Sequence, residues 1–312
     1  MFRYFIRRLL QMIPVILGAT LLIYALVFAL PGDPVAAMFG SRPVNQQVAA
    51  QIRAEYNLDK PFFVQYLLFL KNAVTLDFGR TFSGQPVLSI MGRAFPVTIK
   101  LAIMAFVFEG LFGIVFGIIS GLNKGKWFDS VILVLSLLLI SVPTFVTGFV
   151  MQYFLGVKWH VFPVTASSNN SFLDLLMPAM VLGSASMAYI IRLTRTEVSS
   201  NRTLDYVRTA RAKGMSNKNV IVRHILRNSL IPVVTYLGAD LGALMGGAMI
   251  SERIFNIFGV GYALYDGIYR GEQTLVVSLV TVLVFIFVIC NLAVDMLYAV
   301  LDPRIRYHAS QA

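Results

Sequence analysis

Long apolar runs separated by shorter polar segments fill most of the chain. A helix needs about 20 mostly apolar residues to cross a membrane. The pattern predicts six such spans, at residues 9–30, 97–121, 130–155, 175–192, 231–251 and 274–300. The expected fold is therefore an all-α membrane protein with six transmembrane helices.

The first apolar run raises the question of a signal peptide. Leu9 to Leu30 follows Arg3, Arg7 and Arg8, and secretory signals also begin with basic residues before an apolar run. This run is longer than the ~7–15-residue apolar core of such signals, which favours an uncleaved first span. A cleaved signal peptide is the alternative.

Lys and Arg gather in every second connection. They are abundant in residues 122–129, in residues 192–230 and in the tail after residue 300. Excess positive charge marks the cytoplasmic loops of membrane proteins. Both termini are therefore expected in the cytoplasm, with the long segment 31–96 and the two other connections on the outer side.

The composition agrees with a membrane protein. Hydrophobic residues make up 57% of the chain and charged residues 13%, whereas a soluble domain has roughly 25% charged residues. The net charge of +11 would suit nucleic acid, but in a membrane protein it reports cytoplasmic loops, and no nucleic-acid partner is expected. The single cysteine, Cys290, allows no internal disulfide, and three histidines far apart in sequence argue against a structural zinc site.

Two spans carry glycines four residues apart. They are Gly113, Gly117 and Gly121 in one span, and Gly238, Gly242 and Gly246 in another. Such stripes let membrane helices approach closely. Packing inside the bundle is one interpretation, and an interface with a second subunit or a pore is the other.

Three residues within the apolar runs need an explanation. Pro143 removes a backbone donor, so a bend is expected in the third span. Glu109 and Asp240 are acids in spans, where a central carboxylate costs about 2.5–3.5 kcal/mol and generally faces protein or water. Contact with a solute or proton and a structural hydrogen bond to a neighbouring helix are both open for these acids.

The segment 205–232 is long and basic, although it lies between two strongly apolar spans. Residues 203–214 suit a helix. Thr203 is the expected N-cap, Asp205 lies in the first turn, where the helix dipole favours an acid, and Gly214 is the expected end.

Small residues recur on one face of this predicted helix. Tyr206, Ala210 and Gly214 follow one another every four residues, which places them on the same face. The rest of the surface carries Arg208, Arg211 and Lys213. A face with Ala and Gly at its centre fits a protein groove, whereas a lipid-bound helix shows bulky apolar residues opposite its charges.

A second helix is expected from near Ser216 toward Pro232. Together the two helices form an elbow that suits a docking surface for another protein. The alternative is a solvated basic loop resting on anionic membrane lipid, which contributes about 1 kcal/mol per Lys or Arg.

Common catalytic and nucleotide-binding patterns are missing. The chain has no G-x-x-x-x-G-K-[ST] phosphate loop, no G-x-S-x-G elbow and no H-E-x-x-H. We therefore expect a non-catalytic chain without a cofactor or metal of its own, with a membrane-bound enzyme as a remote alternative.

Several long stretches resemble one family. They are LPGDP (30–34), NLDKPFFVQY (57–66), LDFGRTF (76–82), DYVRTARAKG (205–214), RHILRNSLIP (223–232) and NLAVDMLYAVLDPRIRY (291–307). In this order they resemble the B-type permease subunits of bacterial ABC importers, in the dipeptide/oligopeptide/nickel branch. The resemblance covers nearly the whole chain.

The chain departs from the general importer pattern at several points. The family's cytoplasmic E-A-A…G loop reads Arg208-Thr209-Ala210 here when aligned on Gly214, and Pro232 comes about five residues late. Both departures look typical of the peptide/nickel branch, and they put in doubt a salt bridge from the family glutamate. Phe258 stands where the branch usually has Pro, and GEQ (271–273) replaces an acidic-aromatic-Pro run.

The resemblance implies a type I ABC importer transmembrane domain that works by alternating access in the bacterial cytoplasmic membrane. The implied partners are a second, homologous permease subunit, two ATP-binding subunits that hold ATP and Mg²⁺, and an external solute-binding protein. The helix 203–214 would enter a cleft of the ATP-binding subunit. Ala210 and Gly214 would allow close approach, with Arg208, Arg211 and Lys213 as the charged rim.

Short peptides are the leading substrate, and nickel or a metal chelate, glutathione and glycosides stay open. From a different class, a stand-alone secondary transporter or channel would explain six spans and intramembrane acids, but it would not need the elbow. A neighbouring gene for a Walker-motif ATPase would discriminate between them.

The chain divides into three expected parts. Residues 1–30 are the N-terminus and first span, 31–96 an external segment, and 97–312 the core permease domain with its coupling loop at 193–230. The amphipathic stretch 48–73 in the external segment suits either a cap that meets the binding protein or a simple lid.

Overall fold

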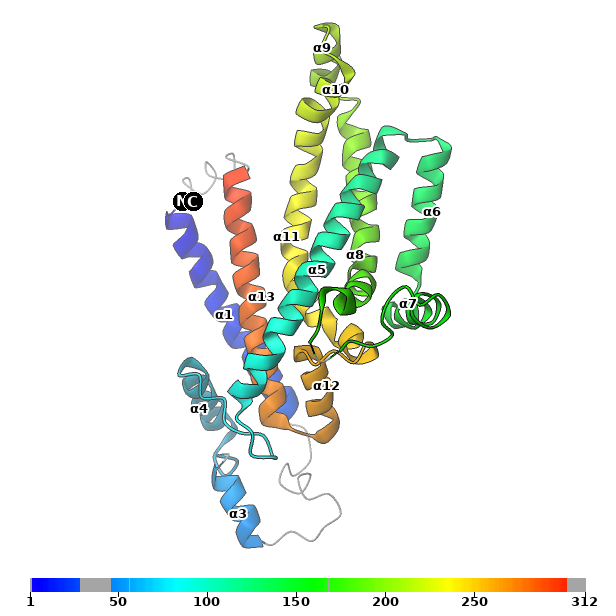
Figure 1. The fold of residues 1–312 in the computed structure, drawn as a ribbon. Helices are drawn as coiled ribbons and strands as arrows, with labels where there is room; N and C mark the ends of the chain where they lie inside the picture. Colours follow the sequence, from blue (N-terminus) through cyan, green and yellow to red (C-terminus); the bar gives the residue numbers. More distant parts are fainter. Residues whose placement is uncertain (1, 29–45, 56, 168, 302–312) are drawn as a thin grey trace.

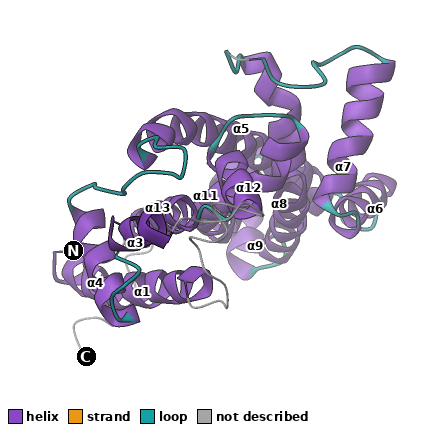
Figure 2. Ribbon diagram, turned by 90° about the horizontal axis from the view of Figure 1, so that it is seen from below, coloured by secondary structure: helices purple, strands orange, loops and turns teal. Residues whose placement is uncertain are grey.

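The computed structural model describes residues 2–28, 46–55, 57–167 and 169–301 (Figure 1). The LPGDP stretch and the basic C-terminal tail therefore lie outside the described residues. Within these ranges the chain is helical, and Figure 2 shows no strand. The only strand-like feature there is one bridge between Arg80 and Pro86. The predicted all-α membrane fold is confirmed.

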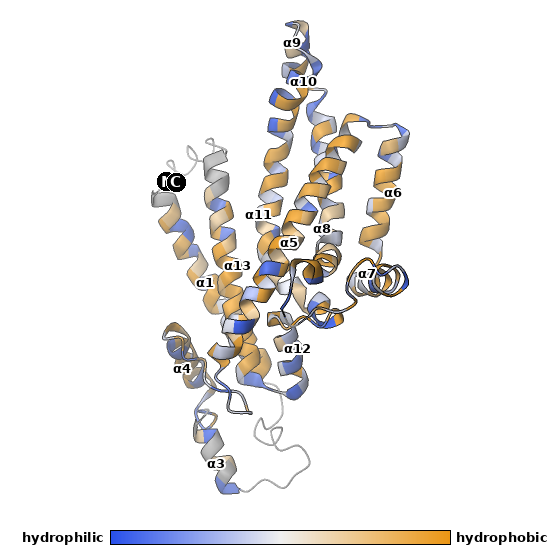
Figure 3. Ribbon diagram, viewed as in Figure 1, coloured by the Kyte–Doolittle hydropathy of each residue, from blue (hydrophilic) through white to orange (hydrophobic). Residues whose placement is uncertain are grey.

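Five helices in the described part of the chain are long and apolar enough to cross a membrane. They are α1 (Phe2–Phe28), α5 (Val87–Leu122), α8 (Phe172–Asn201), α11 (Arg227–Ile254) with the short turns before it, and α13 (Gln273–Leu301). They run side by side as a bundle (Figure 1). Orange, apolar colour dominates most of them in Figure 3.

The predicted third span is broken rather than gently bent. Helix α6 (Trp127–Ser141) ends, and α7 (Thr144–Met151) continues into the π-helical η1 (Gln152–Lys158) at an angle of 106°. Pro143 is the N-cap of α7, and Val142 before it is extended, as proline requires of the preceding residue. Counted as one span, this pair brings the total to the six expected.

Several helices are longer than the predicted spans. Helix α5 begins at Val87, whereas the expected span began at 97. Helix α8 continues to Asn201, whereas the expected span ended at 192. The prediction that Arg192 and Arg195 lie in a loop is therefore wrong, because helical backbone continues past the apolar run.

The core forms where α5, α8 and α11 meet. It includes Leu101, Ala102 and Ala105 of α5, Leu175, Met177 and Val181 of α8, and Leu244 and Ala248 of α11. Each is nearly or fully buried. This core holds α8 and α11 so that both lead toward the basic segment between them.

Two helices that precede α5 lie at the end of the bundle opposite α9 (Figure 1). The amphipathic stretch 48–73 folds as two helices, α3 (Gln46–Glu55) and α4 (Phe62–Val74), separated by a turn. The Tyr66 hydroxyl lies 2.9 Å from the Thr20 hydroxyl and donates to the carbonyl of Leu17. These contacts fix α4 to α1. The short helix α12 (Val260–Arg270) lies at the same end of the bundle.

Candidate functional site

The basic elbow, residues 202–226, projects beyond the ends of α5 and α6 (Figure 1). It contains α9 (Asp205–Ala212), α10 (Asn217–Asn219) and the π-helical η2 (Val220–Leu226). Figure 3 shows blue, hydrophilic residues gathered there, in contrast to the orange spans below. The predicted elbow of two helical pieces between spans is therefore present.

The start of α9 differs from the prediction. Its N-cap is Leu204, which offers no side-chain hydrogen bond, and the Thr203 hydroxyl donates instead to the carbonyl of Ser200. Thr203 as the cap is wrong, because α8 runs on to Asn201 and its last turn takes that hydroxyl. Asp205 does lie in the first turn of α9, where the dipole favours it.

Helix α9 ends just before Gly214, as the sequence predicted. Gly214 has φ +77°, and its N–H donates to the carbonyl of Arg211 while the N–H of Met215 donates to that of Ala210. This is the Schellman arrangement, which needs a left-handed residue and favours Gly. A Cβ on Gly214 would meet nothing within 4 Å, so the glycine is exposed on the outside.

Only one member of the small-residue face is turned inward: Ala210 is buried, whereas Tyr206 and Gly214 are exposed. Ala210 and Val207 are buried against Val198, Val220 and Ile225, which belong to α8 and η2. Ala210 is therefore covered by α8 and η2 of its own chain, and its contact with a partner stays a prediction.

The outer surface of α9 is polar. It exposes Asp205, Tyr206, Arg208, Thr209, Arg211 and Lys213. The Arg208–Asp205 ion pair, at 3.5 Å, is largely solvent-exposed and contributes little stability. The Tyr206 hydroxyl donates to Asn201 Oδ1 at 2.6 Å. Arg208, Arg211 and Lys213 are thus available to a partner.

The second helical piece begins as predicted but does not stop at Pro232. Ser216 is its N-cap, and helix continues without a break through η2 into α11, so that one helical run extends from Asn217 to Ile254. Pro232 lies inside α11. The elbow is therefore connected to α11 by continuous helix.

A buried ion pair anchors the base of the elbow. Arg195 Nε and Nη2 donate to the two carboxylate oxygens of Asp129 at 2.6 and 2.8 Å. Ser120 Oγ and the N–H of Gly125 also donate to this carboxylate, at 2.5 and 2.8 Å. Arg202 donates to the carbonyl of Leu122. The α5–α6 turn and the end of α8 are thus tied together.

Sequence reasoning missed this anchor. Asp129 precedes the apolar run 130–155, and Arg195 was assigned to a loop. The one local signal is an acid in the first turn of a helix, which by itself predicts only a dipole contact. Only the packing of α6 against α8 brings the two charges together.

A basic hollow of about 520 Å³ lies beside α9. Its lining includes Lys124 from the α5–α6 turn, Arg202 after α8, and Arg208 and Arg211 of α9. Four cationic side chains from three parts of the chain suit an acidic partner surface or an anionic headgroup.

The first glycine stripe packs inside the bundle. A Cβ on Gly113 or Gly121 would come within 2.8 Å of Ile190 or Val198 on α8, and Gly117 meets Thr194 more closely still. In the second stripe, Gly238 and Gly242 meet Val294 and Phe287 of α13, but a Cβ on Gly246 would meet nothing within 4 Å. Packing inside the bundle therefore describes the first stripe and two glycines of the second, and an interface or a pore stays a prediction for Gly246.

The two intramembrane acids lie together. Glu109 of α5 is fully buried, and the carboxyl group of Asp240 on α11 lies close enough to interact with it electrostatically. Both Glu109 oxygens and Asp240 Oδ2 are without a donor from the described residues. Because carboxylates only accept, the pair can hydrogen-bond only when one member carries a proton.

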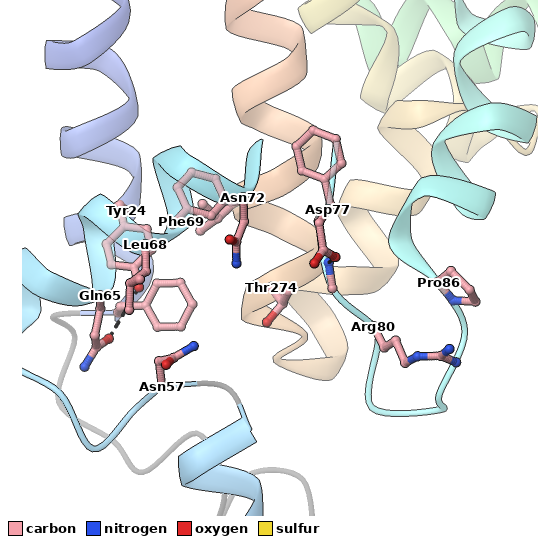
Figure 4. A pocket seen from close by; sticks show the side chains of 14 residues that line it. Tyr24, Asn57, Gln65, Leu68, Phe69, Asn72, Asp77, Arg80, Pro86 and Thr274 are labelled. Carbon is pink, nitrogen blue, oxygen red and sulfur yellow. Dashed lines mark hydrogen bonds between the residues drawn. The ribbon is translucent and has the colours of Figure 1, made fainter. Parts of the chain in front are cut away.

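Two hollows lie at the end opposite the elbow. One, of about 410 Å³, is lined by Tyr24, Gln65, Asn72 and Asp77 among others, and Asn72, Asp77 and Thr274 face a common space (Figure 4). Tyr24 donates to Gln65 at its edge.

The second hollow, of about 470 Å³, is lined by both Phe258 and Glu272. The sequence is expected to depart at these positions from the branch that it resembles. Burial raises the pKa of Glu272 above its usual range, and Arg270 partly opposes that shift. The two departures, distant in sequence, thus belong to one surface.

Comparison with known proteins places these features in a family. Residues 113–307 match the family described as binding-protein-dependent transport system inner membrane component, and residues 1–102 match its N-terminal companion family. A dipeptide transport system permease protein of Escherichia coli (strain K12) is 34% identical, covering 98% of this chain and 99% of that protein. A di/tripeptide transport system permease protein of Pseudomonas aeruginosa is 35% identical, over 98% and 99%. A glutathione transport system permease protein of Escherichia coli (strain K12) is 34% identical, over 98% and 100%.

Proposed function

The chain belongs to the binding-protein-dependent transport system inner membrane component family, and from that premise we propose that it carries short peptides across the membrane. It is an ABC importer permease of a bacterial inner membrane. The observation that carries the peptide assignment is full-length similarity, at 34% and 35% identity, to permeases named for dipeptides and di/tripeptides.

The proposal includes partners. A second, homologous permease subunit would complete the path, two ATP-binding subunits would hold ATP and Mg²⁺, and an external binding protein would deliver the peptide. Lys124 and Lys126 in the α5–α6 turn, and the cations of the elbow, support placing the elbow and both termini on the cytoplasmic side.

We propose that the outer face of α9 enters a groove of an ATP-binding subunit. Arg208, Arg211 and Lys213 would make its charged contacts, and Gly214 would allow the groove wall to approach. ATP can shift the permease between inward- and outward-facing states only if these contacts differ between the two states of the ATP-binding subunits.

The packing supports a route for this coupling. Val207 and Ala210 press on Val198 of α8 and on Val220 and Ile225 of η2. Because η2 continues into α11, a displacement of α9 reaches both α8 and α11. The Arg195–Asp129 pair would pass it to the α5–α6 turn.

Gly214→Trp tests the docking site. We expect uptake of a labelled dipeptide to fall more than tenfold, with normal abundance in the membrane and loss of the ATP-binding subunits from a mild-detergent pull-down, because the indole blocks the groove. Gly214→Ala is the matched control for backbone strain, and Val222→Trp, at a 53% exposed position of η2, is the control for bulk. Uptake at the normal rate in Gly214→Trp would refute α9 as the coupling helix.

Glutathione is a second candidate substrate, favoured by the 34% identity to a glutathione permease. Competition in the intact importer separates the two. If dipeptides are the substrate, excess unlabelled dipeptide abolishes uptake of labelled dipeptide and excess glutathione does not. The reverse pattern with labelled glutathione would reassign the substrate.

A further inference from the structure

The exposed surfaces of α5 and α8 differ in chemistry. On α5 the exposed residues at four-residue spacing are Ile99, Ile103, Val107 and Leu111, all apolar. On α8 the exposed residues at spacings of three or four are Ala185, Tyr189, Arg192 and Thr196. A surface that meets lipid is apolar throughout, as on α5, so the exposed stripe of α8 faces something else.

Arg192 is the decisive member of the α8 stripe. It is exposed, and no acidic side chain pairs with it among the described residues. It lies six residues before Val198, which packs against Gly121 at the end of α5. Helical side chains leave the backbone tilted toward the N-terminus, which here is away from the elbow. The Arg192 side chain therefore leaves its helix in the direction of the membrane interior, where an unpaired charge requires water or protein around it.

Helix α11 continues this surface. Tyr189 of α8 and Tyr236 of α11 have ring centroids 4.5 Å apart. Asp240 lies one turn beyond Tyr236 on the same face, followed by the exposed Ala243 and Gly246. The two helices thus share one face, which we call the α8–α11 face, with a positive and a negative group on either side of the tyrosine pair.

Behind Asp240 lies Glu109, whose oxygens find no donor in the described part of the chain. A Cβ on Gly183 would come within 3.4 Å of Glu109 Oε2 and closer still to the backbone of Ala105, so glycine at this position keeps the space open. A buried carboxyl pair without donors is costly unless a proton or a cation accompanies it. An ammonium group that reaches Asp240 would supply the missing donors.

We propose that the α8–α11 face lines the aqueous path, where Arg192 binds the carboxylate of the transported peptide and Asp240, backed by Glu109, binds its ammonium group. On α8, Arg192 lies three residues from Tyr189 in the direction of the elbow. On α11, Asp240 lies four residues from Tyr236 in the opposite direction. At about 1.5 Å of rise per residue, the charges are about 10 Å apart along the bundle. That distance equals about three extended residues, and the inference rests on the peptide assignment above.

Water access is tested by cysteine labelling in the assembled importer, in a Cys290→Ser background. Ala185→Cys and Thr196→Cys are compared with Ile103→Cys and Val107→Cys, using a charged, membrane-impermeant thiol reagent. We expect the two α8 positions to react at least tenfold faster than the two α5 positions. Equal, slow reaction at all four positions would overturn the path assignment.

Charge recognition is tested by transport with the same complex. Arg192→Gln and Asp240→Asn should each lower tripeptide uptake about tenfold or more, while ATP-binding subunits are still recovered in a pull-down. Arg192→Lys should retain part of the uptake. If Arg192→Gln or Asp240→Asn lost the ATP-binding subunits, as is expected of Gly214→Trp, these side chains would act in assembly and their proposed role in binding the peptide would be overturned.

The substrate side gives the sharper readout. Wild-type complex should prefer a tripeptide with a free C-terminus over its C-terminal amide, and Arg192→Gln should lose that preference. Arg192→Gln with wild-type uptake and wild-type preference would overturn the role of Arg192. If the importer moves glutathione but not dipeptides, the proposed substrate fails, yet the labelling and charge tests can still be made with glutathione.

Discussion

The two glycine stripes share a spacing but not a use. The stripe on α5 lies against α8 along its whole length, and the atoms that its glycines meet include backbone carbonyls. The stripe on α11 meets only α13 at Gly238 and Gly242 and then opens at Gly246. The first binds two helices into a fixed pair, whereas the second ends on the face that we propose to line the path.

This difference shows that a glycine stripe allows another helix to approach closely, but does not predict which helix or surface does so. Backbone neighbours, such as the Ile191 carbonyl beside Gly117, cannot move away. Side-chain neighbours, such as Phe287 beside Gly242, can rotate. The stripe on α5 should therefore tolerate substitution least.

The largest effect is expected at the ion pair that joins α6 to α8 beside the α5 stripe. Asp129→Ala leaves the mostly buried Arg195 without its carboxylate and Ser120 without its acceptor. Removing one partner of a buried pair costs about 3 kcal/mol or more. The free energy of unfolding in lipid–detergent micelles should fall by about that amount. Arg195→Met with Asp129→Leu should recover part of it; a fall no larger than for an exposed pair such as Arg208–Asp205 would refute the anchor.

Gly117→Val should break the stripe itself. The new side chain would overlap Thr194 and the carbonyl of Ile191, and overpacking of this kind costs about 1–3 kcal/mol. We expect a lower unfolding free energy by about 2 kcal/mol, measured in the same micelles. Thr194→Ala in the same chain should restore only part, because the carbonyl stays. An unchanged stability would mean that the helices separate easily.

Gly242→Ala should have a smaller cost than Gly117→Val. Its Cβ would lie 2.8 Å from Phe287 Cδ2, but Phe287 is 44% exposed and can rotate. We expect a loss of about 1 kcal/mol or less in the same assay. Phe287→Leu should remove this loss, and a cost above that of Gly117→Val would reverse the comparison.

Gly246→Ala should do least to the isolated chain. The methyl group meets nothing within 4 Å, and Ala is a better helix former than Gly by about 0.8–1 kcal/mol. The unfolding free energy should stay equal or rise slightly. If Gly246 faces the path or the second permease, Gly246→Trp lowers uptake while leaving this stability unchanged. Normal uptake in that variant would place Gly246 outside both.

Much of the fold was predictable from local pattern. The apolar runs predicted the spans, because about 20 apolar residues have one stable place in a membrane. Gly214 predicted the end of α9, since a left-handed residue after a helix favours glycine. Pro143 predicted a change of direction. The size of that change, 106°, was not predictable, because it depends on what α7 packs against.

The inward position of Ala210 on α9 was not predictable for a related reason. A spacing of four residues shows that Tyr206, Ala210 and Gly214 share a side, but not whether that side meets a partner or the chain's own helices. The structure turns Ala210 inward onto Val198 and Val220. The cationic residues are therefore left as the surface that a partner can reach.

By itself, the sequence determined the membrane class, the spans and a basic elbow between two of them, because these depend on composition and on residues close together in the chain. Only the tertiary structure decided which charges meet. Arg195 pairs with Asp129, 66 positions away, and Glu109 faces Asp240 from another helix. Arg192 lies on a helix surface without an acidic partner in the described part of the chain. Such contacts depend on how the helices pack. The spacing of residues along one helix shows which of them share a side, but not which other helix packs against that side.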